Sequence, residues 1–324
     1  GVLVTSYDGR PTKVEGNPLH PASLGATDPF HQAAVLELYD PDRSRTPLVT
    51  RAEPGSTPSP GDSPTPQSAR NRADLAAVER FIRDHFRNPD LDPAGIAVLA
   101  EPSASPTLLD MRERFADKFP GSTWCDWEPL HRDHETRGSA LALGGKPHRA
   151  LHHLDRAEIL ACFDRDMLGP ADPEFLTNAR GFARARKTVD LDRTMARLYA
   201  VEPALTLTGA KADVRLPAAP ERVHALLLAL AHRLMPERAN ASQAPHPTLT
   251  EPESAWLDKL ARDLNDHRGR SVIALGPEYP AELHALVWTL NHHLGNLGTT
   301  LHAVPEPGRD ANPKTGRLDS LTRA

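Results

Sequence analysis

Five short strand-like stretches, separated by stretches with helical periodicity, constrain the fold of this chain more than any other feature. They lie at residues 95–100, 122–127, 158–163, 197–202 and 271–276. Residues 95–100 form a continuous apolar run, which is typical of a strand that is covered on both faces of a sheet. Strands that alternate with helices pair in parallel through right-handed crossovers. We therefore predict an α/β fold with doubly wound, mostly parallel sheets and flanking helices.

The helices that should cover these sheets are indicated by apolar residues at helical spacing. Ser105 is a favoured N-cap residue and Pro106 a favoured first helical residue, while Gly295 suits the position after a helix end. We expect helices at 29–39, 72–86, 106–119, 131–143, 175–186, 219–234, 251–267 and 280–294.

The first residues predict a small N-terminal β-hairpin. Val2 and Val4 are apolar on a short strand, Asp8-Gly9 is a strong turn signal, and the return strand ends before Gly16-Asn17-Pro18. The proline- and serine-rich stretch at residues 52–70 cannot form a core.

These patterns divide the chain into four parts. We expect a hairpin and loop region at 1–50, a linker or insertion at 51–71, and a Rossmann-like α/β body at 72–300 that allows two interleaved subdomains. Residues 301–324 are expected to be a tail that starts a further segment. The chain begins without Met, so we interpret it as a fragment of a longer protein.

The charge distribution narrows the classes of partner. The net charge is −5, and no block of Lys and Arg occurs, which argues against nucleic acid as a partner. No run reaches the roughly 18 apolar residues that a membrane span requires. We therefore expect no nucleic acid partner and no direct membrane span.

The chain contains two cysteines, Cys125 and Cys162, each inside an apolar run. A tetrahedral thiolate site or an iron–sulfur cluster usually needs about four ligands. We interpret both cysteines as small buried hydrophobic residues.

Other motifs with possible chemistry are weak. No G-x-G-x-x-G follows a strand, and Gly144-Gly145-Lys146 is followed by Pro147 where a phosphate-binding loop needs Ser or Thr. Asp164 and Asp166 follow a predicted strand, where ligands bind in such folds, but helix capping or turn formation is the default interpretation. Histidines cluster at 131 and 134, at 148, 152 and 153, and at 292 and 293; we interpret these as solvated or helix-end residues, because no third metal ligand is indicated.

The loop after the hairpin carries a family resemblance. Gly16-Asn17-Pro18-Leu19-His20-Pro21 resembles the N-terminal iron–sulfur region of the complex iron–sulfur molybdoenzymes, in the molybdopterin-oxidoreductase superfamily. In that family the loop continues past a glycine, here Gly25, to a cysteine that is the last ligand of a 4Fe–4S cluster. Asp28 stands at the cysteine position. The resemblance thus implies a vestigial loop of Gly16, Asn17, Pro18, His20, Gly25 and Asp28 that has lost its cluster.

The stretch 25–44 is similar to the large iron–sulfur subunit of alternative complex III, which contains a cofactor-free molybdopterin-like domain. The stretches 198–203, 206–217 and 290–300 carry the same similarity. In molybdenum enzymes of the superfamily a Pro-Gly-Thr-Asp loop lies against the nucleotide of the pterin cofactor. Pro220-Glu221-Arg222-Val223 occupies that position here, so the resemblance implies that a second cofactor-holding element is missing.

The resemblance implies a non-catalytic domain of a membrane-associated, quinol-oxidising electron-transfer complex on the periplasmic face of the bacterial inner membrane. The domain would be a scaffold for an iron–sulfur ferredoxin-like domain, cytochrome c and membrane quinol-oxidising subunits. We expect no catalytic residue, metal ligand or cofactor in this chain, and iron–sulfur clusters in a C-terminal domain that it lacks. Two alternatives stay open: a fragment of a genuine molybdopterin-dependent oxidoreductase with cluster ligands outside it, and an unrelated nucleotide- or sugar-binding module.

Overall fold

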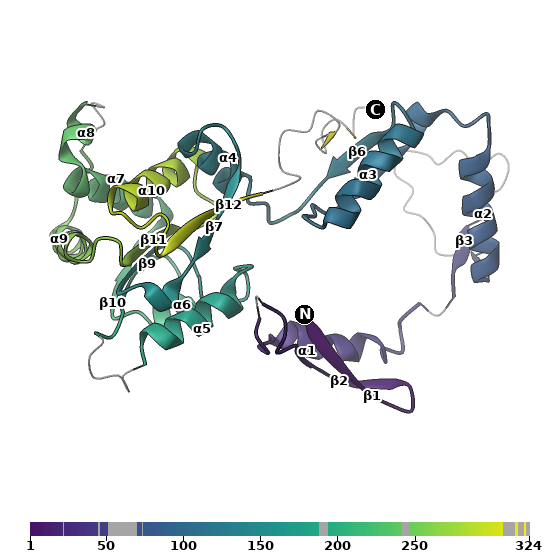
Figure 1. The fold of residues 1–324 in the computed structure, drawn as a ribbon, viewed down its shortest axis with the longest axis horizontal. Coiled ribbons are helices and arrows are strands. Elements are labelled where there is room, and N and C mark those ends of the chain that lie inside the picture. The colour runs from purple at the N-terminus through teal and green to yellow at the C-terminus, as the bar shows by residue number, and fades with distance from the viewer. Residues whose placement is uncertain are drawn as a thin grey trace.

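A computed structural model shows how these segments are arranged (Figure 1). It describes residues 1–21, 23–44, 46–50, 70–72, 74–187, 194–241, 246–306, 315–316 and 321. Most of the expected linker at 51–71, and most of the expected tail beyond 306, lies outside the described residues.

A four-stranded parallel sheet forms the centre of the α/β body. Its order is β10-β9-β8-β11, so the chain moves outward from β8 to β10 and then returns to the other side of β8. The switch in direction lies between β8 and β11, which is where open α/β sheets usually bind ligands. The strands are β8 (Ile159–Phe163), β9 (Arg197–Glu202), β10 (Val214–Pro217) and β11 (Ser271–Leu275).

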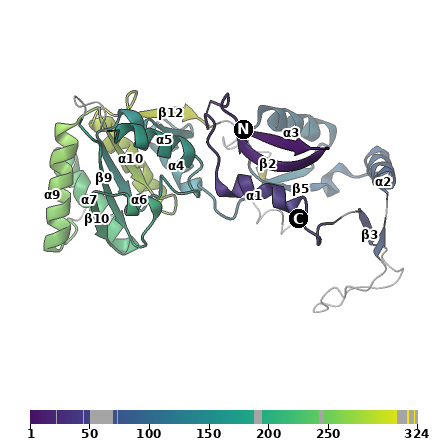
Figure 2. The same cartoon turned by 90° about the horizontal axis from the view of Figure 1, so that it is seen from below.

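Side chains alternate between the two faces of this sheet, and each face has its own hydrophobic core. Ile159, Ala161 and Phe163 pack with the helices α7 (Pro220–Leu234), α9 (Glu251–Asp266) and α10 (Ala281–His293). Leu160 and Cys162 pack on the opposite face with α5 (Phe175–Ala185). Figure 2 shows α9 at the outer end of the body, beside α7 and β10. The parallel sheet and its flanking helices agree with the prediction.

The outer edge of β11 is closed by carboxamide side chains. Asn291 of α10 accepts a hydrogen bond from the Ile273 N–H (3.1 Å) and donates to the Ile273 carbonyl (2.9 Å). Asn296 donates to Asn291 Oδ1 (3.0 Å) and accepts from the Ser271 hydroxyl (3.0 Å). Thr300 donates to the Ser271 carbonyl (2.5 Å). These buried side chains satisfy backbone groups that an edge strand would otherwise leave unpaired.

Two strand pairs depart from the expected architecture. β7 (His148–His152) and β12 (Leu301–Pro305) form an antiparallel pair, with Leu301 opposite His152. The sequence pattern predicts a tail from residue 301 and no strand at 148–152, whereas the structure has a strand at each place. The run His148-Arg149-Ala150-Leu151-His152 lacks the apolar continuity that identified the other strands. β3 (Leu48–Thr50) and β4 (Arg70–Arg72) pair antiparallel at the two ends of the expected linker.

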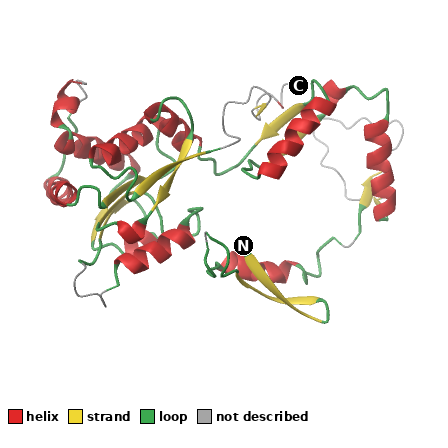
Figure 3. Cartoon of the chain, viewed as in Figure 1, coloured by secondary structure: helices red, strands yellow, loops and turns green. Residues whose placement is uncertain are grey.

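A second parallel sheet lies to one side of the body (Figure 1). Its order is β13-β6-β5, with β5 (Ala97–Ala100), β6 (Thr123–Asp126) and β13 (Thr315–Gly316). The helices of this region are α2 (Leu75–Arg87) and α3 (Pro106–Lys118). Figure 3 shows these elements and those of the body by secondary structure. The remaining helices are α4 (Asp133–Ala142), α6 (Leu207–Ala210) and α8 (Pro236–Ala241), with one-turn helices at Pro93–Gly95 and Leu154–Arg156.

The N-terminal hairpin forms as predicted. β1 (Val2–Tyr7) pairs antiparallel with β2 (Arg10–Gly16), and Asp8 and Gly9 both have positive φ, as tight hairpin turns require. The helix α1 (Pro29–Glu37) packs against β2. Within the described part of the chain, no helix is both long and apolar enough to cross a membrane.

Substitution of Asn291 tests the closure of the sheet edge. Asn291→Ala leaves the Ile273 N–H and carbonyl buried without partners, and such groups cost about 1–3 kcal/mol each. We expect the free energy of unfolding to fall by about 3 kcal/mol, measured by urea denaturation followed by circular dichroism. His292→Ala, next along α10 but exposed, should change it by less than about 0.5 kcal/mol. Equal effects of the two substitutions would contradict the role assigned to Asn291.

Candidate functional site

The loop after the hairpin is closed by its own backbone. The Asn17 carbonyl accepts hydrogen bonds from the His20 N–H (3.1 Å) and the Gly25 N–H (3.0 Å). The Asn17 side chain accepts from the Leu19 N–H (2.9 Å). These hydrogen bonds bring the two ends of the loop together.

Glycine is needed where the loop closes. A Cβ on Gly16 would lie 2.3 Å from the Gly25 carbonyl oxygen, so no larger residue fits there. Gly25 itself has φ +90°, a backbone conformation that favours glycine, and it packs beside Pro18. His20 contacts Gly1 and lies 3.4 Å from the Ser23 hydroxyl through Nδ1.

Asp28, which stands at the family's cysteine position, is the N-cap of α1. Its side chain is 4% exposed and accepts a hydrogen bond from the His31 N–H (2.8 Å). It also pairs with the His31 ring. Burial raises the pKa of this carboxyl. The hydrogen bonds from His31 lower the pKa by more than burial raises it, so it lies below its usual value. The Asp28 carboxylate is therefore fully used in starting a helix.

The loop contacts the α/β body through Arg180 of α5. The Arg180 guanidinium donates to the Leu24 carbonyl (2.9 Å), next to Gly25. The loop thus docks on the face of the body that α5 covers.

The carboxyl ends of β8 and β9 carry internally paired polar groups. The Tyr279 hydroxyl donates to Asp164 (2.9 Å), and a Cβ on Gly276 would lie 2.3 Å from the Asp164 carbonyl oxygen. Glu202 accepts from the Thr206 hydroxyl (2.6 Å) and from Arg215 (2.6 Å). These contacts bring β8, β9 and the segment after β11 together where doubly wound sheets commonly bind nucleotides.

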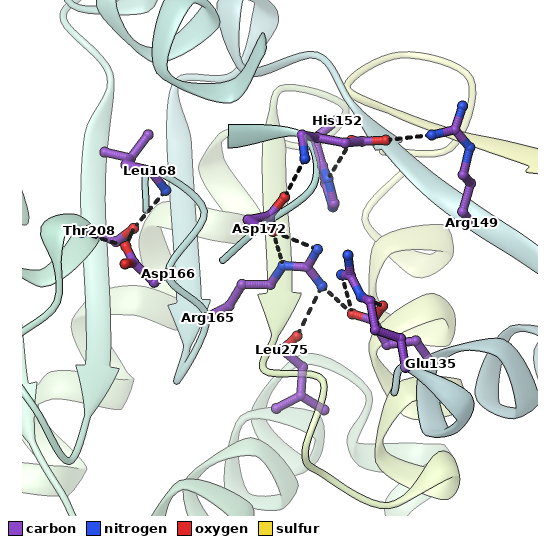
Figure 4. A network of polar contacts seen from close by, with 11 residues as sticks. Glu135, Arg149, His152, Arg165, Asp166, Leu168, Asp172, Thr208 and Leu275 are labelled. Atoms are coloured by element: carbon purple, nitrogen blue, oxygen red, sulfur yellow. Dashed lines mark hydrogen bonds and ion pairs between the residues drawn. The ribbon is translucent and has the colours of Figure 1, made fainter. Parts of the chain in front are cut away.

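Asp166 connects the β8 loop to α6. It accepts hydrogen bonds from the Thr208 N–H (2.9 Å) and hydroxyl (2.7 Å), while Thr208 Oγ1 accepts from the Leu168 N–H (3.0 Å) (Figure 4). Of the two interpretations considered for Asp164 and Asp166, these contacts favour loop structure over ligand binding.

Pro220 to Val223, which the resemblance aligns with a Pro-Gly-Thr-Asp loop, form the first turn of α7. Pro220 is the first residue of that helix, and Arg222 makes paired hydrogen bonds to Glu253 of α9 (2.8 and 2.5 Å). The Arg222 side chain lowers the pKa of Glu253 to about 2, against a smaller effect of burial. The hydrogen bonds between Arg222 and Glu253 hold α7 against α9.

Arg165 lies at the centre of an ionic network beside the switch in strand order (Figure 4). Its guanidinium donates to Asp172 (2.9 Å) and to the Leu275 carbonyl (3.3 Å), and it pairs with Glu135 of α4. Arg132 makes two further hydrogen bonds to Glu135 (2.5 and 2.9 Å). Burial raises the pKa of Glu135, but Arg165 and Arg132 lower it more, to about 2.

A cavity of about 290 Å³ adjoins this network. Its walls come from α4, α10, the β7–β12 pair and the carboxyl end of β11. Ile273, Val287, Trp288 and Leu301 supply apolar surface, and His152 and His284 reach it among the charged residues. Sequence reasoning singled out His152 only as part of a cluster and did not single out Arg165, Glu135 or His284. A histidine inside the apolar face of the 280–294 helix was the one available signal.

The remaining histidine clusters give no metal site. The rings of His131 and His134 are 6.1 Å apart, and His153 lies edge-on to His302 at 4.8 Å. Among the residues that the structure describes, no group of three His, Cys, Asp or Glu side chains could hold a metal ion.

An iron–sulfur cluster, which the family resemblance raises, does not fit the residues of this chain. Cys125 and Cys162 lie in different sheets, on β6 and β8, and both are buried. Two separated thiols cannot supply a four-thiolate set, and Asp28 is already the N-cap of α1. The fit of a pterin cofactor is judged from the polar side chains near its expected place. Arg222 and the polar groups at the ends of β8 and β9 are engaged with other side chains.

Comparison with known proteins agrees with the superfamily indicated by the sequence. No family model matches the chain. Over 48 residues, 15% of this chain, it is 48% identical to the menaquinone reductase, molybdopterin-binding-like subunit, of Nitratidesulfovibrio vulgaris (strain Hildenborough), of which the match covers 7%. The fold is similar to acetylene hydratase from Pelobacter acetylenicus, with a TM-score of 0.58 at 13% identity over 93% of this chain. The chain spans 42% of the length of that hydratase. The short match shows a likeness to a molybdopterin-binding-like subunit, and the structural match shows a shared fold.

Asp28→Ala tests the capping role of this carboxylate. Loss of an N-cap costs about 1 kcal/mol, so we expect faster amide hydrogen exchange in α1 and little change in the body. Asp28→Asn, which can still cap, should restore most of the protection. Unchanged exchange in Asp28→Ala would contradict the assignment.

The same carboxylate predicts a pH dependence. Because its pKa is lower in the folded than in the unfolded state, its stabilisation of α1 is complete above the unfolded pKa of about 3.9 and is lost as pH falls through the folded pKa. Protection of α1 in the wild type should therefore fall in acid more steeply than in Asp28→Asn.

The buried thiols should be unreactive in the folded protein. Burial raises the pKa of Cys162 to about 12, and Cys125 is fully buried. Since the thiolate is the reactive form, we expect no reaction of either thiol with Ellman's reagent at pH 8 and full reaction of both in urea. Rapid reaction of Cys162 in the folded protein would contradict its place in the core.

Proposed function

We propose that this chain is a molybdopterin-oxidoreductase-like domain without catalysis of its own, acting as a scaffold in a membrane-associated, quinol-oxidising electron-transfer complex of the alternative complex III type. The observation that carries the proposal is the use of Asp28. At the position of a cluster ligand, the chain has a buried carboxylate committed to the first turn of α1.

The rest of the loop supports the same interpretation. Gly16, Asn17 and Gly25 hold its shape through backbone hydrogen bonds and close packing. These contacts support a loop whose architecture is kept after its cluster chemistry is lost. The contact between Arg180 and Leu24 then makes the loop part of the surface of the body.

The partners that we propose are an iron–sulfur ferredoxin-like domain, cytochrome c and membrane quinol-oxidising subunits, on the periplasmic face of the inner membrane. The short match to a subunit of a menaquinone reductase supports an association with quinone chemistry. In this proposal the electrons pass through the partners, and this chain holds those partners in place.

Metal analysis of the purified chain, and of the complex recovered through a tag on it, tests the proposal. We expect molybdenum and tungsten at far less than one atom per chain in both samples. We also expect the tagged chain to recover c-type haem and iron–sulfur signals from solubilised membranes. One atom of molybdenum or tungsten per chain would overturn the proposal in favour of a genuine molybdopterin enzyme, and recovery of the chain alone would overturn the scaffold role.

Asp28→Cys provides the matched control. It restores a thiol at the family position, but a cluster needs about three further thiolates, so the variant should gain no stoichiometric iron.

A further inference from the structure

The helix α2 presents an apolar side that is largely exposed. It begins after Asp74, whose side chain accepts a hydrogen bond from the Ala77 N–H (2.6 Å), and none of its residues is buried. Leu75 is 65% exposed, Phe81 69% and Ile82 49%. Removing such side chains from water is favourable, so this side of the helix is suited to contact with an apolar environment.

The apolar residues of α2 gather along one side of the helix. At about 100° per residue, four of them fall within an arc of about 80°: Leu75, Val78, Ile82 and Phe86. Phe81 lies about 60° beyond Val78 on the same side. The Phe86 ring contacts the Phe119 ring that follows α3, with 5.7 Å between the ring centroids. This contact covers part of one residue and leaves most of the apolar side open.

The other side of α2 carries a row of arginines. Arg80, Arg83 and Arg87 fall within an arc of about 60°, turned about 130° from the apolar arc. All three side chains are exposed, and none makes an ion pair or hydrogen bond within the described part of the chain. The acidic residues of the helix are Glu79 and Asp84, so three arginines against two carboxylates leave it with an excess of positive charge.

The position of α2 leaves both of its sides accessible. Figures 1 and 2 both show α2 at the end of the molecule away from the α/β body and from α9. A helix in this position can lie along a flat surface without obstruction by the body. The whole chain has a net charge of −5, which opposes approach to an anionic surface. Attraction to such a surface therefore has to come from a local group of cations such as this one.

A phospholipid bilayer matches both sides of α2 at once. Helices with basic residues on one side and Leu or Phe on the other commonly lie in the plane of a membrane surface. Their apolar side enters the boundary between the headgroups and the acyl chains. Long arginine side chains extend along such a boundary to reach the lipid phosphates, with which guanidinium groups form strong hydrogen bonds. This charge complementarity favours an anionic membrane over a purely apolar partner.

We propose that α2 binds the surface of an anionic phospholipid membrane. Leu75, Phe81 and Ile82 face the acyl chains, and the arginine row contacts the phosphates. The 13 residues of α2 extend over about 20 Å, less than the bilayer core of about 30 Å, so the helix lies in the surface and does not cross it. The inference goes beyond the scaffold role, which concerns protein partners, and it does not depend on the metal content of the chain.

Flotation of the full chain with lipid vesicles tests the proposal. At about 0.1 M salt, where charges act over about 10 Å, we expect the chain to float with vesicles of phosphatidylcholine and phosphatidylglycerol. Binding to vesicles of phosphatidylcholine alone should be at least about tenfold weaker, because each arginine near an anionic surface contributes about fivefold. At about 1 M salt, where charges act over about 3 Å, the difference between the two vesicles should disappear.

Replacement of two arginines tests the charged side. Arg83→Gln together with Arg87→Gln should weaken binding to the mixed vesicles about 25-fold, at about fivefold for each charge. Lys259→Gln together with Arg262→Gln removes the same charge from exposed positions on α9, at the other end of the molecule. This matched control should change binding by less than about twofold, because these residues do not lie near the lipid.

Replacement of two apolar residues tests the other side. Phe81→Ser together with Ile82→Ser should weaken binding to both kinds of vesicle at least about tenfold, because interfacial binding scales with the apolar area that is buried. Leu205→Ser together with Leu207→Ser changes two exposed leucines elsewhere, 68% and 56% exposed, and should leave binding unchanged. Circular dichroism should be the same for all four double variants, since each replaces exposed side chains.

Two results would overturn the proposal. If the full chain does not float with the mixed vesicles, α2 does not bind a membrane surface; a dimer that Phe81→Ser with Ile82→Ser dissociates would then assign this side to a second copy of the chain. If the chain floats and neither double variant in α2 weakens binding, the lipid contact lies elsewhere. The first point is decided on the wild-type chain alone, whatever the variants do.

Discussion

The hydrogen bonds from Asn291 to the outer edge of β11 are the constraint on which the rest of the body depends. A parallel sheet must hide both faces, and an open edge within a packed body would bury unpaired backbone groups. By bonding to both the N–H and the carbonyl of Ile273, Asn291 satisfies that edge and fixes α10 against β11. The position of α10 then determines where α4 can lie, because a Cβ on Gly138 would meet the His284 Cβ at 2.3 Å. The close crossing of these helices places Glu135 beside Arg165 and forms one wall of the cavity.

The sequence predicted the elements whose signals are local. Strand-like stretches marked β8, β9 and β11, and Asp8-Gly9 marked the hairpin turn. The strands β7 and β12 escaped prediction because His and Arg interrupt their apolar pattern, and because their pairing joins segments about 150 residues apart. The Arg165 network escaped for a related reason. Its members come from α4, from the segment after β8 and from the end of β11, and no spacing along the chain records that they meet.

The loop from Gly16 to Asp28 keeps its shape through contacts that do not involve the side chain at position 28. Its shape depends on the Asn17 carbonyl, on the close contact of Gly16 with Gly25 and on a positive φ at Gly25. These determinants are independent of the residue at position 28. A carboxylate can therefore stand at that position with a structural role of its own, since an aspartate at a helix start is favourable in its own right. The family motif in the sequence could indicate the loop, whereas only the structure reveals the use to which Asp28 is put.

The pairing of β7 with β12 has a consequence for how the chain acquires its structure. Along the sequence, all strands of the parallel sheet of the body, from β8 to β11, lie between these two strands. Contacts of such long sequence separation form slowly, and a nascent chain cannot make them until its last partner has left the ribosome. The cavity, whose walls include both strands, therefore forms only after β12 has been synthesised. Until residue 305 emerges, His152 and the carboxyl end of β11 remain open to solvent and to other proteins in the cell.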